Sequence, residues 1–174
     1  AVMTGIALFF MAFAWTITRN VLSLGVLLLT ACVFKTLDAL LLSVPVVSGT
    51  VANPMFGFFT EILAFIIIVF LVGKRFMNKL IFRPVTGAGS ALLAAVMFPL
   101  VGIITGIPAC LYPGTQIPLS VAVSPVAIII SAVTVPLGFA VAEKYIKVFE
   151  TEGRSGINPW LRYGLSPMVI LACF

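Results

Sequence analysis

Long uninterrupted apolar runs are the feature that most restricts how this chain can fold. They cover residues 1–18, 21–44, 54–72, 87–107 and 119–142, and a shorter sixth run follows Asn158-Pro159 and continues to Phe174. A helix needs about 20 residues to cross the apolar core of a bilayer. The runs do not alternate between apolar and polar residues as barrel strands do. The sequence therefore predicts an all-α, polytopic transmembrane helix bundle with about six membrane-spanning helices.

The composition supports a membrane rather than water as the solvent of the fold. Hydrophobic residues make up 62% of the 174 residues, and charged residues only 9%. A soluble domain carries about 25% charged residues, and a fold of this size could not hide so much apolar surface from water. We expect one transmembrane domain over residues 1–174. Because the chain is already apolar at Ala1, we also expect native N-terminal residues upstream of it.

The connections between the runs carry charge in an alternating pattern. Arg19, the linker 73–86 and the region 143–162 are charged, whereas connections 45–52 and 108–118 carry no charge. Basic connections face the cytoplasm, so this pattern orients the helices and explains the net charge of +5 without nucleic acid. We predict a multi-pass protein of a bacterial or archaeal cytoplasmic membrane.

Local signals predict several details of the helices and their contacts. Asn53-Pro54 is typical of a helix start. In the linker 73–86 we expect a short interfacial helix, and we expect Gly87, Ala91 and Ala95 to bring the fourth run into close contact with its neighbours. Four basic residues of that linker are expected to contact lipid headgroups or a partner: Lys74, Arg75, Lys79 and Arg83.

Three ionisable residues interrupt the second and third runs. If the uncharged connections face outward, Asp38 lies about 9 Å, Glu61 about 10 Å and Lys35 about 14 Å below the outer ends of their helices. We therefore predict that they form one cluster in the outer half of the membrane. Phe58 and Phe65 share the helix face of Glu61 and are candidates to stack on a ring or cation.

Two interpretations of this cluster stay open. In one, Lys35 and Asp38 form a salt bridge, Glu61 is protonated, and the three residues only fix how two helices pack. In the other, they form the polar floor of an outward-facing ligand site, because ionisable groups within a membrane commonly mark substrate or proton routes. The formal charge of −1 would suit a cationic ligand, a proton or a sodium ion.

Catalytic and cofactor signals are missing from the sequence. The chain has no histidine, and its three cysteines show no metal-ligand spacing. We therefore expect no enzyme activity, no cofactor and no bound metal, and a membrane enzyme or redox subunit ranks last among the possible functions.

The short helices, the proline-rich outer connections and the outward-facing cluster together resemble the substrate-binding (S) component of energy-coupling factor transporters. This resemblance implies capture of a small, micronutrient-like solute outside the cell, with a transmembrane coupling protein and cytoplasmic ATPases as partners. A solute-binding or transporting membrane protein is accordingly our first functional hypothesis. The alternative is a non-catalytic membrane subunit that anchors or completes a larger complex with other membrane subunits.

Overall fold

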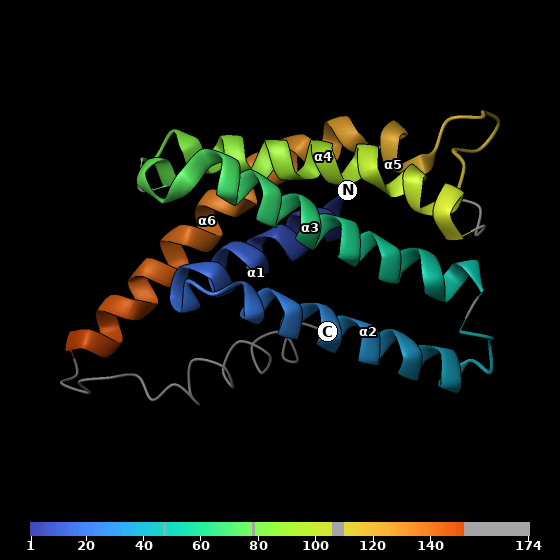
Figure 1. The fold of residues 1–174 in the computed structure, drawn as a ribbon, viewed down its shortest axis with the longest axis horizontal. Coiled ribbons are helices and arrows are strands. Elements are labelled where there is room, and N and C mark those ends of the chain that lie inside the picture. Colours follow the sequence, from blue (N-terminus) through green and yellow to red (C-terminus); the bar gives the residue numbers. More distant parts are fainter. Residues whose placement is uncertain (47, 78, 106–109, 152–174) are drawn as a thin grey trace.

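The chain folds into a bundle of helices (Figure 1). The computed structural model describes residues 1–46, 48–77, 79–105 and 110–151, and for 74–77, 104–105 and 148–151 it describes the backbone alone. Its helices are α1 (Val2–Thr18), α2 (Val21–Leu41), α3 (Gly49–Met77), α4 (Phe82–Thr105), α5 (Leu119–Ala122) and α6 (Ser124–Thr151). The predicted all-α bundle is confirmed.

Four of these helices are long and apolar enough to cross a membrane: α2, α3, α4 and α6. Helix α1 is equally apolar but has 17 residues, slightly fewer than a full crossing needs. The chain is thus an integral membrane protein. The predicted sixth run lies outside the described residues, so the count of about six spans stays a prediction.

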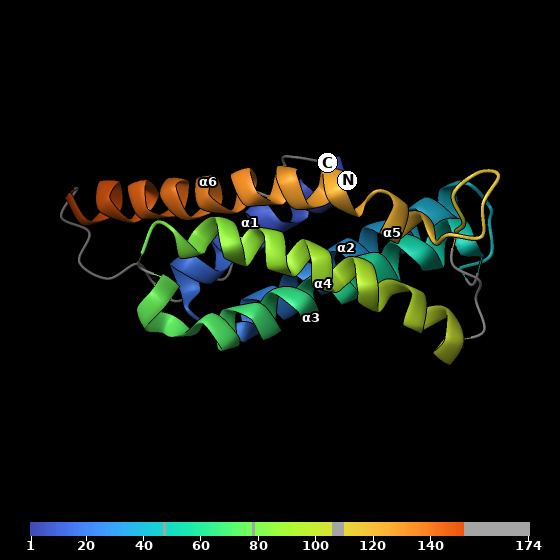
Figure 2. The same ribbon diagram turned by 90° about the horizontal axis from the view of Figure 1, so that it is seen from above.

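The helices pack in two groups that share α4. In the first, α6 lies against α1 and α4; in the second, α3 lies between α4 and α2. Figure 2 shows α6 on the opposite side of the bundle from α3, with α1 and α4 between them. The buried core includes Leu8 of α1, Leu24 of α2, Phe65 of α3 and Phe139 of α6. Helix α4, which we predicted to be central, touches α1, α3, α5 and α6.

The two ends of the bundle differ in charge (Figure 1). At one end lie the α1–α2 corner with Arg19, the α3–α4 connection with Lys79, and the last turns of α6 with Lys144. We call this the charged end. The opposite end, here called the uncharged end, holds the connection 42–48 and the described part of the α4–α5 connection, 110–118, neither of which carries a charge.

Glycines allow α6 to approach its neighbours closely. A Cβ atom added at Gly138 would lie 2.5 Å from the carbonyl oxygen of Phe9 on α1, and one added at Gly87 of α4 would overlap the carbonyl of Ser131 on α6. Thr134 also donates a hydrogen bond from α6 to the carbonyl of Gly5, at 2.9 Å. These backbone contacts hold α1, α4 and α6 together as one unit.

The start of α3 differs from the prediction. The helix begins at Gly49 rather than Pro54, because the Ser48 carbonyl accepts the amide of Ala52 at 2.8 Å and opens the first turn. Pro54 lies in the second turn, where it lacks the amide hydrogen that would bond the Thr50 carbonyl. The side chain of Asn53 does not cap the helix but donates to Cys110 Sγ at 3.2 Å.

The predicted helix in the linker 73–86 is seen in part. Helix α3 breaks at Gly73, whose φ of 73° glycine adopts readily, and helical residues continue past this break to Met77. The interfacial position of this segment stays a prediction. Helix α4 then begins at Phe82, five residues before the predicted Gly87. The connection between α3 and α4 therefore has fewer residues than the predicted linker 73–86.

The fifth predicted run, 119–142, is two helices rather than one. Helix α5 is a single turn that ends at Ala122, and α6 continues nine residues past Ala142, to Thr151. Glu143 and Lys144 lie on this extension, which shows that the charged residues do not end the helix.

Candidate functional site

A cavity of about 380 Å³ lies among α1, α3, α4, α5 and α6 on the side of the uncharged end. Its wall includes Gly49 and Asn53 from the start of α3, Cys110 from the α4–α5 connection, and Leu119 from α5. The first turn of α1 contributes Thr4. A volume of this size falls within the range of small-molecule sites, about 300–1,000 Å³.

Small side chains create the space. Helix α4 presents Ala91, Ala94 and Ala95 to the cavity at helical spacing, and α3 presents Gly57. Ala127 of α6 completes this set of small residues in the wall. Had these positions carried large aliphatic residues, α3, α4 and α6 would have filled this region with core packing.

Glu61 is the acidic residue in the cavity wall. The Thr4 hydroxyl hydrogen-bonds its carboxyl group. The other carboxyl oxygen, Oε2, is shielded from solvent and has no hydrogen-bond partner among the described residues. None of the described side chains in the wall is cationic. The cavity wall therefore contains a carboxyl group with one unsatisfied oxygen, which neighbouring atoms cover.

Hydrogen bonds fix the wall near the uncharged end. Ser120 donates to the carbonyl of Ala95 at 3.2 Å. That carbonyl would normally accept the amide of residue 99, but Pro99 has no amide hydrogen. The proline in α4 thus frees a carbonyl that anchors α5. The α4–α5 connection is held in turn by the Leu119 amide, which donates to the Cys110 carbonyl at 2.8 Å.

The structure does not bring the three predicted ionisable residues together. Lys35 Nζ donates to Asp38 Oδ2 at 2.8 Å, so these two form the expected pair on α2. Their side chains are 32% and 49% exposed, and neither lines the cavity of Glu61. All three residues lie on the predicted helices, but the ion pair does not line the cavity of the carboxyl group.

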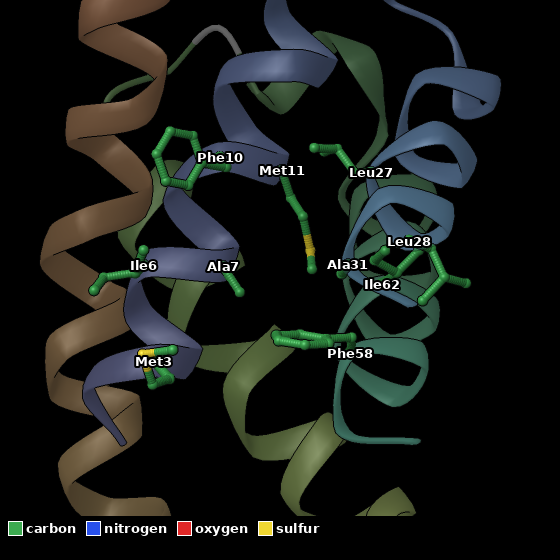
Figure 3. A pocket seen from close by; sticks show the side chains of 10 residues that line it. All are labelled: Met3, Ile6, Ala7, Phe10, Met11, Leu27, Leu28, Ala31, Phe58 and Ile62. Carbon is green, nitrogen blue, oxygen red and sulfur yellow. The ribbon is translucent and has the colours of Figure 1, made fainter. Parts of the chain in front are cut away.

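The two predicted aromatic contacts also lie outside this cavity. Phe65 is fully buried in the core. Phe58 lines a second, smaller cavity of about 50 Å³, whose walls are entirely apolar. Figure 3 shows the side chains of α1, α2 and α3 around that space. The aromatic residue beside the Glu61 cavity is instead Phe98 of α4.

The four basic linker residues have different surroundings. The side chains of Lys74 and Arg75 lie outside the described part of the structure, and Lys79 is exposed. Arg83 is only 7% exposed and bonds Glu143 through both of its terminal nitrogens; the NH1–Oε2 distance is 3.3 Å. The ring of Phe139 lies 5.2 Å from the guanidinium carbon. Arg83 thus joins α4 to α6.

Sequence reasoning missed most of the cavity wall. Thr4, Asn53 and Ser120 are single polar residues in apolar or loop segments, and nothing in their spacing distinguishes them. The alanines of α4 did give a signal, since Ala91 and Ala95 were recognised as small residues at helical spacing. That signal predicts helix contact, whereas part of this face lines open space.

Comparisons with protein-family models, with curated proteins and with solved structures find no match.

Proposed function

We propose that this protein binds a small solute with a cationic group in the Glu61 cavity, on the outer side of a cytoplasmic membrane. The observation that carries this proposal is that Glu61, whose Oε2 atom has no hydrogen-bond partner among the described residues, lines a cavity of about 380 Å³. The orientation rests on the basic residues of the charged end, which favour the cytoplasmic side. Transport of the bound solute, as in the proteins that the sequence resembles, is part of the same proposal.

A cationic group suits this site for electrostatic reasons. A carboxylate held in apolar surroundings is unfavourable unless it is paired. Hydrogen bonds between a cation and a carboxylate are about twice as strong as those between neutral groups. An ammonium group at Oε2 would complete the hydrogen bonding that Thr4 begins on this carboxyl, while Phe98 and the alanines of α4 contact the apolar part of the solute.

Thermal unfolding of the full-length protein in detergent tests the proposal. The probes are ethylammonium, choline and sodium chlorides, with ethanol as the uncharged control. We expect at least one cation to raise the unfolding temperature. A probe present at 100 times its Kd would stabilise the protein by about 2.7 kcal/mol. Glu61→Gln should fold and lose this response, because the amide keeps the shape of the side chain without its charge.

Asp38→Asn is the matched control. It also removes a carboxylate from a membrane-spanning helix, but Asp38 lies outside the cavity. We expect this variant to keep the response to the cation. The proposal fails if none of the probes shifts the wild-type unfolding temperature, or if Glu61→Gln responds as the wild type does.

A second candidate function, a subunit of a larger membrane complex, is favoured by the surface of α2. This helix is the least buried of the four membrane-spanning helices, and it exposes the Lys35–Asp38 pair. A charged pair is unfavourable against lipid and is usually shielded by protein. Native mass spectrometry in a mild detergent tests this alternative, and a stable monomer whose mass is unchanged by Lys35→Ala/Asp38→Ala would count against it.

A further inference from the structure

The wall of the Glu61 cavity is exposed at one end and buried at the other. Four lining residues at the uncharged end are exposed, and we call them the rim: Gly49, Thr50, Cys110 and Leu119. Lining residues farther from that end are covered, and three of them are at most 4% exposed: Thr60, Ala91 and Ala127. This gradient of exposure indicates that the cavity opens at the uncharged end.

The rim joins two segments that are far apart in the sequence. One side is formed by the first residues of α3, and the other by the α4–α5 connection and the first residue of α5. A hydrogen bond crosses from one side to the other: Asn53 Nδ2 donates to Cys110 Sγ at 3.2 Å. A thiol sulfur is a weak acceptor. This bond therefore spans the opening and can break at little cost.

Other hydrogen bonds shape the α4–α5 connection without involving α3. The Tyr112 amide donates to the Ile117 carbonyl at 2.9 Å, so the connection is bonded to itself. The bond from Ser120 to the Ala95 carbonyl holds α5 on α4. A break between Asn53 and Cys110 would therefore widen the opening without unfolding the connection.

The lining residues of α3 form a continuous track from the rim to the carboxyl group. They follow one another three or four residues apart, which keeps them on one helix face: Thr50, Asn53, Gly57 and Glu61. Eight residues separate Asn53 from Glu61, or about 12 Å at 1.5 Å per residue. Halfway along, a Cβ added at Gly57 would meet only the Phe98 ring, at 3.9 Å. Open space thus continues between the rim and Glu61.

We infer that solutes enter the Glu61 cavity from the uncharged end, through the rim, and that the Asn53–Cys110 hydrogen bond restricts this entrance. The inference rests on the proposed function for the identity of the solute, whereas the entrance is a property of the empty cavity. Because the bond lies about 12 Å from Glu61 along α3, it controls how fast solutes enter and leave rather than the contacts made at the carboxyl group.

The reactivity of a cysteine placed inside the cavity tests this entrance. The three cysteines of the full-length chain are replaced by Cys32→Ala, Cys110→Ser and Cys173→Ala, and Gly57→Cys supplies the only thiol. The hydroxyl of Cys110→Ser keeps an acceptor for Asn53. The probe is 2-(trimethylammonium)ethyl methanethiosulfonate, a cationic reagent that does not cross lipid. The thiolate attacks its sulfenyl sulfur, forms a mixed disulfide and releases methanesulfinate, and intact-mass spectrometry in detergent follows the rate.

We expect the Gly57→Cys thiol to react in the folded protein. Asn53→Ala should raise the rate about two- to tenfold, the range that the loss of one hydrogen bond permits. Thr50→Trp places an indole on the rim and should lower the rate about tenfold, because thiol reactions depend on access. The control is Gly25→Cys in the same background, on α2 outside the cavity, and neither substitution should alter its rate.

A Gly57→Cys thiol that reacts only after denaturation in sodium dodecyl sulfate would overturn the entrance, and so would an unchanged rate in Thr50→Trp. An unchanged rate in Asn53→Ala would overturn the role of the hydrogen bond. If Gly57→Cys does not unfold cooperatively, Ala94→Cys in the same wall takes its place. Labelling needs access but no affinity. A reactive cavity thiol in a protein that responds to no cation would refute the proposed function alone, and the reverse result would refute the entrance alone.

Discussion

The contact between α1 and α6 gives a quantitative test of how the bundle is held together. At Gly138, an added Cβ would lie 2.5 Å from the carbonyl oxygen of Phe9 and 3.2 Å from the Cβ of Ala12. The nearer atom belongs to the backbone of α1, so no side-chain rotation can relieve the overlap. Gly138→Ala should therefore force α1 and α6 apart.

The size of this effect follows from the distances. Ordinary contact begins at 3.4 Å, so the helices must separate by nearly 1 Å at this level. Overpacking of this kind costs about 1–3 kcal/mol, and the rigid backbone favours the upper half of that range. For a protein of 150–250 residues, 1 kcal/mol shifts the unfolding temperature by roughly 2–4 °C. We expect Gly138→Ala to lower it by about 4–12 °C.

Gly25→Ala on α2 is the matched control, because an added Cβ there meets nothing within 4 Å. Alanine is favoured over glycine in a helix by about 0.5–1 kcal/mol, so this variant should unfold at or above the wild-type temperature. The measurement is thermal unfolding in detergent followed by tryptophan fluorescence, with Trp15 buried in the α1 core as the reporter. An unfolding temperature of Gly138→Ala equal to that of Gly25→Ala would refute this account of the α1–α6 contact.

Two further variants test contacts that join helices. Arg83→Ala leaves the Glu143 carboxylate without its buried partner. It should lower the free energy of unfolding by about 1–3 kcal/mol, less than the loss of a fully buried pair would, because Glu143 is partly exposed. The double variant Arg83→Ala/Glu143→Gln should recover part of this loss, and no recovery would show that charge is not the cause. Ser120→Ala removes the hydrogen bond to the Ala95 carbonyl and should cost about 1 kcal/mol. In a Pro99→Ala background, where the helix amide satisfies that carbonyl, the same change should cost less, and equal losses measured by denaturant unfolding would contradict this role of Pro99.

The helix that carries each ionisable residue was predictable, but its distance from the helix end and its direction were not. That distance depends on where the helix begins or ends, at 1.5 Å per residue, and α3 begins at Gly49 rather than Pro54, whereas α2 ends at Leu41 rather than Val44. Direction depends on how a helix is rotated against its neighbours. Glu61 lines the cavity, whereas Lys35 and Asp38 on α2 do not. For the same reason Phe58 and Phe65, which share a helix face with Glu61 by spacing, lie in other surroundings.

By itself, the sequence determined that this chain is an all-α membrane protein with one charged end and one uncharged end. Hydropathy and loop charge are sums over residues that are neighbours in the sequence, so they can be determined without knowledge of any tertiary contact. Only the tertiary structure decided that Arg83 leaves the linker to pair with Glu143, sixty residues away, and that the alanines of α4 leave a cavity beside Glu61. These features depend on side chains that meet across helices, and no local pattern records which faces will meet.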